Sequence, residues 1–411
     1  MALSRRDFIG NVSAAAAIGG LRPASLAALE SRDNAVTADD PLGVRRDFPV
    51  VEGGIYLDSA YITPSPRQAV DAARAFAESK ATNPVSLGRM LEENNTLRQR
   101  FATLVGSDES EIGVLFATSE GENIIARALD LGEGDNVVID DLHYETTYLL
   151  YQKLSDQRGL EVRIVPSVDG TASAEAFAGY VDERTRLISV AWISHQNGYR
   201  HDLSALADLA HAHGAYLYAD AIQGIGALEL DVRSTGIDFF TAGTYKWLLG
   251  GFGVAPFYVR EDLLDVVTLD RYGSLHISEE LGDHRFRVYE DARKYGYATM
   301  GFGAVFHLRA ALDYLLSVGV PAIEAHTVGL AHRLHEGLTT QGHDVWTPSA
   351  NRSSIVTFRH HRDVDIVRRT IEDAGIRVSF KADGEQLRVG IALFNNADDI
   401  DRLLEVTGAW G

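Results

Sequence analysis

From Ile55 to about residue 260, short apolar runs typical of β-strands alternate with stretches that have the periodicity of amphipathic helices. In residues 203–213, for example, four apolar side chains fall on one helical face: Leu203, Leu206, Leu209 and Ala210. Strands that alternate with helices form βαβ units, so the pattern predicts an α/β domain with a mainly parallel sheet. Such a sheet binds ligands beyond the carboxyl ends of its strands. The strand candidates are residues 113–116, 136–140, 162–166, 187–192, 215–219, 239–242 and 254–259.

The pattern changes in the last quarter of the chain. A long amphipathic helix pattern covers residues 301–318, and the later segments alternate between strand and helix patterns. We therefore expect a large domain over residues 55–300 and a smaller α+β domain over residues 301–411. Residues 28–54 are polar and charged, which predicts a linker or an N-terminal arm.

The first 27 residues have the layout of an export signal. The pair Arg5-Arg6 precedes an apolar run over residues 12–21, which is too short to cross a bilayer of about 30 Å. The pair resembles a twin-arginine signal, with a cleavage site after Ala27; the alternative is an amphipathic helix with incidental arginines. We expect the twin-arginine machinery to export the folded protein to the periplasm, with no stable membrane insertion.

Composition excludes several classes of function. Lys and Arg total 38 against 58 Asp and Glu, a net charge of −20, which argues against a nucleic-acid binder. One local site can still bind an anionic small molecule. The chain has no cysteine, so it has no disulfide, thiolate metal site or cysteine nucleophile. The histidine pairs 211/213 and 360/361 lack the spacing of a shared metal face, and no metal site is predicted.

Two charged residues follow predicted strands. Asp220 comes directly after the run 215–219, and Lys246 precedes the loop Gly250-Gly-Phe-Gly253. Alone, each is better explained as a helix cap or a surface residue. The spacing Asp220…Gln223…Lys246 nevertheless resembles that of the class V aminotransferase family of fold-type I pyridoxal-phosphate (PLP) enzymes. That family includes cysteine desulfurases and isopenicillin N epimerase-like proteins.

The resemblance extends from Tyr56-Leu-Asp-Ser-Ala60 past Asn395 and implies a large domain with a mainly parallel seven-stranded sheet, plus a smaller C-terminal α+β domain. It also implies that PLP is the cofactor. Lys246 would bind it as a Schiff base and carry protons, and Asp220 would pair with the pyridine nitrogen. Gln223 would lie near the ring oxygen or the Schiff base, and His143 would stack on the ring.

A phosphate site is implied where the strand candidate 113–116 leads into a helix. Ser119 and Glu122 have the S-x-x-E spacing of a capping box. The resemblance gives this turn, with Thr118, Ser119 and Glu120, to the PLP phosphate, because a helix N-terminus presents free N–H groups. Thr244 would add another phosphate hydrogen bond.

Other matches concern the ring oxygen and the substrate. His195 or Asn197 would contact the ring oxygen, where many relatives carry asparagine. Arg388 would bind the substrate carboxylate, a task that suits a bidentate guanidinium. Ser59 and Ala60 would also lie against the substrate.

Thr299, in Tyr297-Ala-Thr-Met300, matches the hydroxyl that reaches the phosphate of a neighbouring subunit. The resemblance therefore implies a homodimer with shared active sites.

Three functions remain open. The first expectation is an aminotransferase, epimerase or deaminase acting on an amino acid or another small molecule that bears an amino group. The second is a cysteine-free C–S lyase or another β/γ-lyase. The third is a PLP-fold binding protein without catalysis. Because desulfurases of the family use a cysteine that this chain lacks, we predict that it is not a cysteine-persulfide desulfurase.

Overall fold

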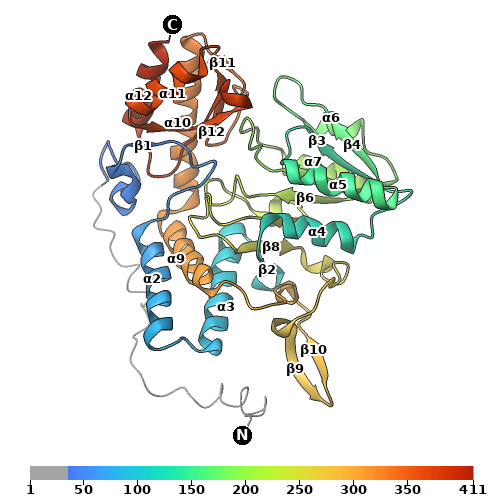
Figure 1. The fold of residues 1–411 in the computed structure, drawn as a ribbon. Helices are drawn as coiled ribbons and strands as arrows, with labels where there is room; N and C mark the ends of the chain where they lie inside the picture. Colours follow the sequence, from blue (N-terminus) through green and yellow to red (C-terminus); the bar gives the residue numbers. More distant parts are fainter. Residues whose placement is uncertain (1–35, 411) are drawn as a thin grey trace.

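A seven-stranded sheet lies at the centre of the computed structural model, which describes residues 36–410 (Figure 1). The predicted signal, residues 1–27, lies outside the described residues. Strands β7 to β4 are parallel, and β8 runs antiparallel to both of its neighbours, β7 and β2. This confirms the predicted mainly parallel sheet. In spatial order the strands are β2 (Ile112–Leu115), β8 (Ala255–Val259), β7 (Phe239–Thr241), β6 (Tyr216–Asp220), β5 (Thr185–Ala191), β3 (Asn136–Asp140) and β4 (Glu161–Val165).

The central strands are mostly apolar because both faces of this part of the sheet are buried. Along β3, Val137 and Ile139 belong to one hydrophobic cluster, while Val138 belongs to the other. This alternation follows from the two-residue period of a strand. The connecting helices are α4 (Thr118–Ala128), α5 (Glu145–Arg158), α6 (Ala174–Ala178), α7 (Leu203–Ala212) and α8 (Val232–Thr235).

Three helices from distant parts of the sequence lie side by side (Figure 1). They are α2 (Arg67–Thr82), α3 (Leu87–Val105) and α9 (Phe302–Val318). Helix α10 (Val320–Thr340) follows α9 across a 78° bend. Within residues 36–410 no single helix is long and apolar enough to cross a membrane; α9 and α10 reach that length and apolarity only when counted together.

A second, antiparallel sheet lies in the C-terminal region. Its spatial order is β11 (Asp344–Val345), β12 (Ile355–Arg359), β15 (Gln386–Gly390) and β14 (Ser379–Lys381), next to α11 (Val364–Asp373) and α12 (Ala397–Gly408). Strand β1 (Ile55–Tyr56) pairs with β13 (Ile376–Arg377), so the segment that enters the large sheet domain also contacts the C-terminal region. This pairing brings residues 58–60 close to β15.

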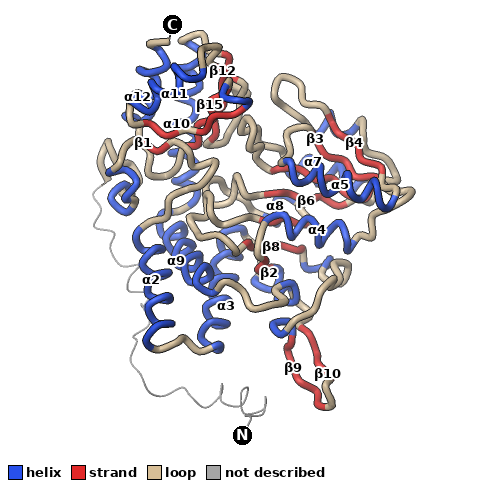
Figure 2. The backbone as a smooth tube through the Cα atoms, in the orientation of Figure 1, coloured by secondary structure: helices blue, strands red, loops and turns tan. Residues whose placement is uncertain are grey.

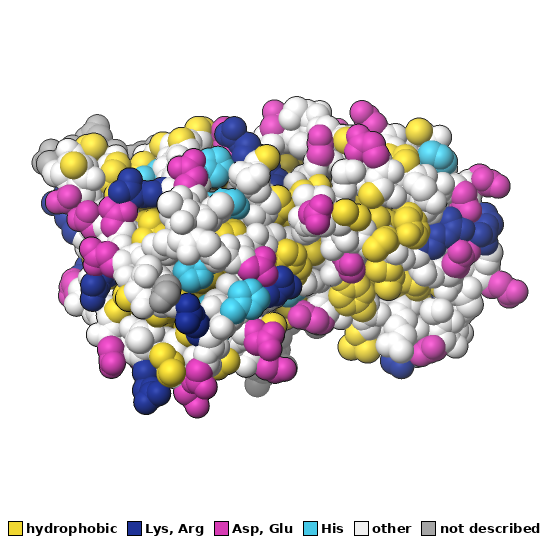
Figure 3. All heavy atoms as spheres, turned by 90° about the horizontal axis from the view of Figure 1, so that it is seen from above, with side chains coloured by type: hydrophobic (Ala, Val, Ile, Leu, Met, Phe, Trp, Pro, Cys, Tyr) yellow, Lys and Arg dark blue, Asp and Glu magenta, His cyan; other side chains and the backbone are white. Residues whose placement is uncertain are grey.

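The remaining elements lie at the periphery. Strands β9 (Ile277–Gly282) and β10 (Arg285–Val288) form a hairpin that projects from the body of the molecule (Figure 2). Short 3₁₀ turns cover Arg45–Asp47, Pro49–Glu52, Glu109–Glu111, Glu261–Leu263, Ser274–His276, Ala292–Tyr295 and Ala382–Gly384. On the face drawn in Figure 3, acidic side chains outnumber basic ones and no continuous basic surface is visible, in keeping with the net charge of −20.

Helix α4 packs so closely on the sheet that only glycine fits at position 121. A Cβ atom there would lie 1.8 Å from Oγ1 of the buried Thr241. We expect Gly121→Ala to lower the free energy of unfolding by about 1–3 kcal/mol, because the helix or Thr241 must shift. Gly329→Ala is the control: its Cβ meets no atom within 4 Å, and alanine should stabilise α10 by up to about 1 kcal/mol. Denaturant unfolding measures both, and a Gly121→Ala protein of unchanged stability would contradict the close packing.

Candidate active site

A cavity of about 280 Å³ opens at the carboxyl ends of the central strands. Seven of the side chains that line it lie at the carboxyl ends of β2, β5, β6 and β7 or in the segments that follow them: Thr118, Ser119, Ile193, His195, Asp220, Gln223 and Lys246. The sheet thus brings six of the predicted site residues to one place, as expected for ligand binding in an open α/β fold.

Lys246 and Asp220 are two buried groups of opposite charge that line this cavity, and the charge of each shifts the pKa of the other. Burial lowers the pKa of Lys246, and the charges of Arg388 and Lys381 lower it further, while the Asp220 carboxylate raises it. Burial raises the pKa of Asp220, against the backbone N–H of Ile222, 3.0 Å away, and the charge of Lys246. Near neutral pH the amine can therefore accept and release a proton, as its predicted role requires.

Gln223 holds the cavity wall together. Its Nε2 donates to the carbonyl of Ala60 at 2.9 Å, and its Oε1 accepts from Trp247 Nε1 at 3.0 Å. The residue thereby ties the segment after β1 to the turn that carries Lys246. Its predicted contact with the cofactor remains a prediction.

Helix α4 points its N-terminus into the cavity, but it is not capped as predicted. The helix starts at Thr118 after Ala117, whose side chain offers no cap, so the Ser119–Glu122 capping box is wrong. Glu120 instead accepts from the Phe116 N–H at 2.9 Å and pairs with Arg271 at 2.7 Å. The free N–H groups of this first turn, with Thr118 and Ser119, are suited to a phosphate.

Glu122 lies in the core behind the cavity, where sequence reasoning did not place it. Its carboxylate accepts from Ser189 Oγ at 2.6 Å and from Thr147 Oγ1 at 2.8 Å. Burial is the main cause that raises its pKa, to about 7, and the two hydroxyls oppose that rise. The only feature of the sequence that could have indicated a buried acid is the position of Glu122 on the side of α4 that faces the sheet.

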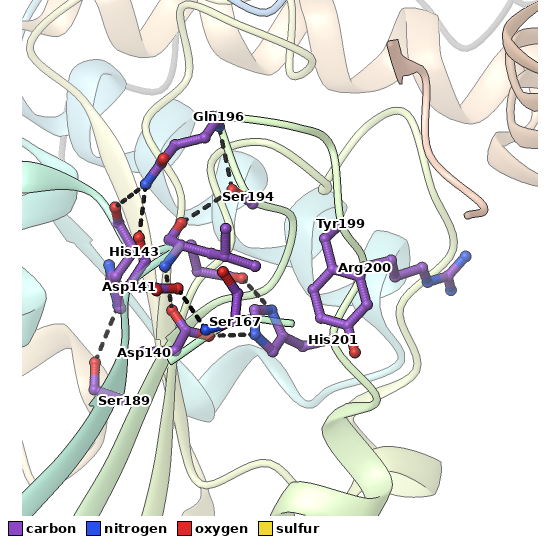
Figure 4. Close-up of polar contacts among 12 residues, drawn as sticks. Asp140, Asp141, His143, Ser167, Ser189, Ser194, Gln196, Tyr199, Arg200 and His201 are labelled. Carbon is purple, nitrogen blue, oxygen red and sulfur yellow. Dashed lines mark hydrogen bonds and ion pairs between the residues drawn. The ribbon is translucent and has the colours of Figure 1, made fainter. Parts of the chain in front are cut away.

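His143 is fully buried, and both of its ring nitrogens have partners (Figure 4). Nδ1 accepts from the Tyr144 N–H at 2.7 Å, and Nε2 lies 3.3 Å from Ser189 Oγ. Burial lowers the pKa of His143 to about 4, so the ring is neutral with its proton on Nε2. Tyr144, rather than His143, lines the cavity. Stacking of His143 on PLP remains a prediction.

A second buried pair fixes the turn that carries His143 (Figure 4). His201 Nε2 lies 2.5 Å from Asp140 Oδ2, and its Nδ1 lies 2.8 Å from the carbonyl of Ala191. From the loop after β5, Ser194 Oγ donates to the carbonyl of Leu142 at 3.0 Å. These bonds join the loops after β3 and β5, and sequence reasoning had not singled out His201.

Two predicted cofactor contacts are corrected. The amide of Asn197 donates to the Gly170 carbonyl at 2.7 Å and accepts from the Tyr199 N–H at 3.0 Å, away from the cavity lining. The hydroxyl of Thr244 is buried and directed at the carbonyls of Gly251 and Val254, at 2.5 and 3.1 Å. Both side chains are committed to loop structure, so neither is placed to bind PLP.

His195 is the better candidate of the predicted ring-oxygen pair. It lines the cavity, its Nε2 lies 3.5 Å from Glu145 Oε1, and its Nδ1 has no hydrogen-bond partner among residues 36–410. Burial lowers the pKa of His195, so its ring is neutral and can donate one hydrogen bond.

Arg388 lies beside the cavity on β15. Its Nη1 donates to the His195 carbonyl at 2.8 Å and its Nη2 to Ser379 Oγ at 3.1 Å, while the buried Nε has no partner in the described chain. Ser59 Oγ is likewise buried without a partner among these residues. Buried polar atoms normally have partners. Orphaned donors at Arg388, Ser59 and His195, next to the Lys246–Asp220 pair, therefore fit a bound PLP and substrate.

Thr299 does not join this group. It is exposed in the segment that precedes α9, and it does not line the cavity. Its contribution to a partner subunit's site remains a prediction. In residues 36–410 no three His, Asp or Glu side chains are grouped to hold a metal ion.

The acid behind the cavity predicts a pH-dependent stability. Because the folded pKa of Glu122 is raised from 4.5 to about 7, the stability that it contributes is present below pH 4.5 and is lost as the pH rises through 7. We expect Glu122→Gln to be about 2–3 kcal/mol more stable, relative to the unchanged chain, at pH 8 than at pH 5. Denaturant unfolding at both pH values measures this. Glu336→Gln, on an exposed position of α10, is the control; equal pH dependence in both variants would contradict the assignment.

Comparison with known proteins identifies relatives along most of the chain. The family model "Aminotransferase class-V" matches residues 55–403. A probable cysteine desulfurase of Halobacterium salinarum is 29% identical over 406 residues, covering 89% of this chain and 95% of the relative. A probable cysteine desulfurase of Methanothermobacter thermautotrophicus is 28% identical over 392 residues, covering 88% and 96%.

Two solved structures share the fold at 21% identity. The apo cysteine desulfurase of Thermococcus onnurineus has a TM-score of 0.82 and covers 91% of this chain and 98% of its own. The cystine C–S lyase C-DES, in complex with its reaction product cysteine persulfide, has a TM-score of 0.81 and covers 89% and 100%.

These findings confirm the fold-type I architecture and PLP as the cofactor. They contradict the prediction that the chain is not a cysteine-persulfide desulfurase, since curated relatives and structural neighbours are named cysteine desulfurases. The prediction treated the absence of cysteine as excluding desulfuration. A chain without cysteine lacks only a sulfur acceptor of its own, and a thiol of another molecule can accept the sulfur. With the family match over residues 55–403, the chain belongs to the aminotransferase class-V family.

Proposed function

We propose that this protein is a PLP-dependent enzyme that cleaves the C–S bond of cysteine or an S-substituted cysteine. The observation that carries the proposal is the buried Lys246–Asp220 pair, in a cavity of a chain whose relatives are named cysteine desulfurases. Because the chain has no cysteine, the sulfur leaves with its own substituent or passes to a thiol of another molecule.

When bound, PLP supplies an electron sink for the substrate α-carbon. The amine of Lys246 removes the α-proton, aided by its lowered pKa, and returns it later. Arg388 holds the substrate carboxylate, and its bond to the His195 carbonyl fixes the guanidinium beside the cavity. Asp220 provides the negative charge that keeps a pyridine nitrogen protonated. The first turn of α4 binds the phosphate through its N–H groups.

The sulfur and its electron pair can leave in two balanced ways. Cysteine and an external thiol would give alanine and the persulfide of that thiol. An S-substituted cysteine and water would give pyruvate, ammonia and the substituted thiol; from cystine that product is cysteine persulfide.

The test combines the purified PLP-loaded protein with L-cysteine plus dithiothreitol, and separately with L-cystine. We expect sulfur release in proportion to alanine or pyruvate, and its loss in Lys246→Ala, because Lys246 is the one lysine among the described residues that line the cavity. Transfer of the amino group to a 2-oxo acid, or inversion at the α-carbon with the C–S bond intact, would refute C–S cleavage. Either result would support the aminotransferase, epimerase or deaminase function instead.

We also propose that the folded protein is exported to the periplasm and works as a homodimer. The pair Arg5-Arg6 with its apolar run supports export, and Thr299 supports the dimer. Expression in a host with a twin-arginine system should give periplasmic protein cleaved near Ala27. Replacing Arg5-Arg6 by two lysines should leave it in the cytoplasm, and an equal distribution of both proteins would refute the export route.

A further inference from the structure

Strands β14 and β15 place a lysine next to the predicted substrate arginine. In their antiparallel register Ser379 lies opposite Arg388, and Lys381 lies opposite Gln386. Side chains alternate between the faces of a strand, so Ser379 and Lys381 project to the same side as Arg388. Diagonal neighbours of this kind are about 7–8 Å apart at their backbones.

Among residues 36–410, neither cation lies within ion-pair distance of a carboxylate. Arg388 donates to a carbonyl and a hydroxyl, and its Nε is orphaned. In the described part of the chain the ammonium of Lys381 makes no hydrogen bond or ion pair. Burial lowers the pKa of Lys381 and the Arg388 charge lowers it further, while the Glu145 and Asp58 carboxylates oppose this by raising it.

Two carboxylates, Asp58 and Glu145, raise the pKa of both Lys381 and Arg388, but each of them also has another contact. Asp58 accepts a short hydrogen bond from Ser379 Oγ, and Arg377 lies 4.0 Å from its carboxylate. Glu145, with its side chain 73% exposed, lies 3.5 Å from His195. Arg377, Lys381 and Arg388 thus outweigh Asp58 and Glu145 by one positive charge.

Arg388 and Lys381 lie near the cavity that contains Lys246. Arg388 donates to the carbonyl of His195, which lines the cavity, and the register places Lys381 on the same side of the sheet as Arg388. The charges of Arg388 and Lys381 accordingly lower the pKa of Lys246 and of His195. An unpaired lysine beside an arginine costs stability unless an anion offsets the repulsion. With one substrate carboxylate assigned to Arg388, Lys381 is left for a second.

Resting on the proposed C–S cleavage, we propose that the substrate is a cysteine derivative whose sulfur substituent carries a second carboxylate, and that Lys381 binds it. A disulfide or thioether with a carboxylate a few bonds beyond the sulfur spans the distance between neighbouring positions on β14 and β15. Lys381 would then determine which sulfur substituent, the group that leaves with the sulfur, the enzyme accepts.

The experiment compares two ligands of similar length, S-carboxymethyl-L-cysteine and S-ethyl-L-cysteine; the first carries a carboxylate where the second has a methyl group. Binding to the PLP-loaded protein is followed by the change in cofactor absorbance, which needs no C–S cleavage. We expect the carboxymethyl ligand to bind at least tenfold more tightly. Lys381→Met should abolish this preference by weakening the carboxymethyl ligand at least tenfold, with S-ethyl-L-cysteine changed less than threefold.

Lys381→Arg should retain the preference, and so should the control Lys153→Met, which removes an exposed lysine of α5. The proposal is overturned if the unchanged protein binds both ligands equally, a result that needs no variant to fold. It is also overturned if Lys381→Met keeps the tenfold preference. A failure of C–S cleavage would instead show as intact ligand, while the absorbance titration still reports the preference.

Discussion

Burial of both faces of the seven-stranded sheet is the constraint on which the site depends. A charged side chain in the middle of such a strand would be stranded in apolar surroundings, at a cost of several kcal/mol. In two inner strands a carboxylate lies at the carboxyl end: Asp140 terminates β3 and Asp220 terminates β6. Since parallel strands end at the same edge, these groups meet in one region, with Lys246 in the turn after β7.

Behind the cavity, buried polar groups form closed sets rather than isolated charges. Asp140 pairs with His201, while Glu122 receives two hydroxyl donors, one of them from Ser189, which also contacts His143. Each set satisfies groups that would otherwise lack partners in a low-dielectric interior. These side-chain hydrogen bonds, in addition to backbone pairing, hold the turns after β3 and β5, which carry His143 and His195.

Beside the cavity, some buried polar atoms lack a hydrogen-bond partner among the described residues. Arg388, His195 and Ser59 each have a buried polar atom without a partner in the described residues, and Lys381 follows on β14. A protein interior tolerates such groups where a ligand completes them.

Sequence alone determined the alternation of strands and helices, and hence the parallel sheet, because apolar periodicity is a local property. Through family resemblance it also located Lys246, Asp220, Gln223 and Arg388. The sequence could not determine which groups each side chain would bond to in the folded protein. The Ser119–Glu122 spacing suggested a cap, yet tertiary packing turned Glu122 toward Ser189, 67 residues away. Asn197 and Thr244 were in the right segments, but their side chains bind loop carbonyls. The pairing of Lys381 with the Arg388 face arises only when β14 and β15 come together, since register between strands is a non-local property that no single segment encodes.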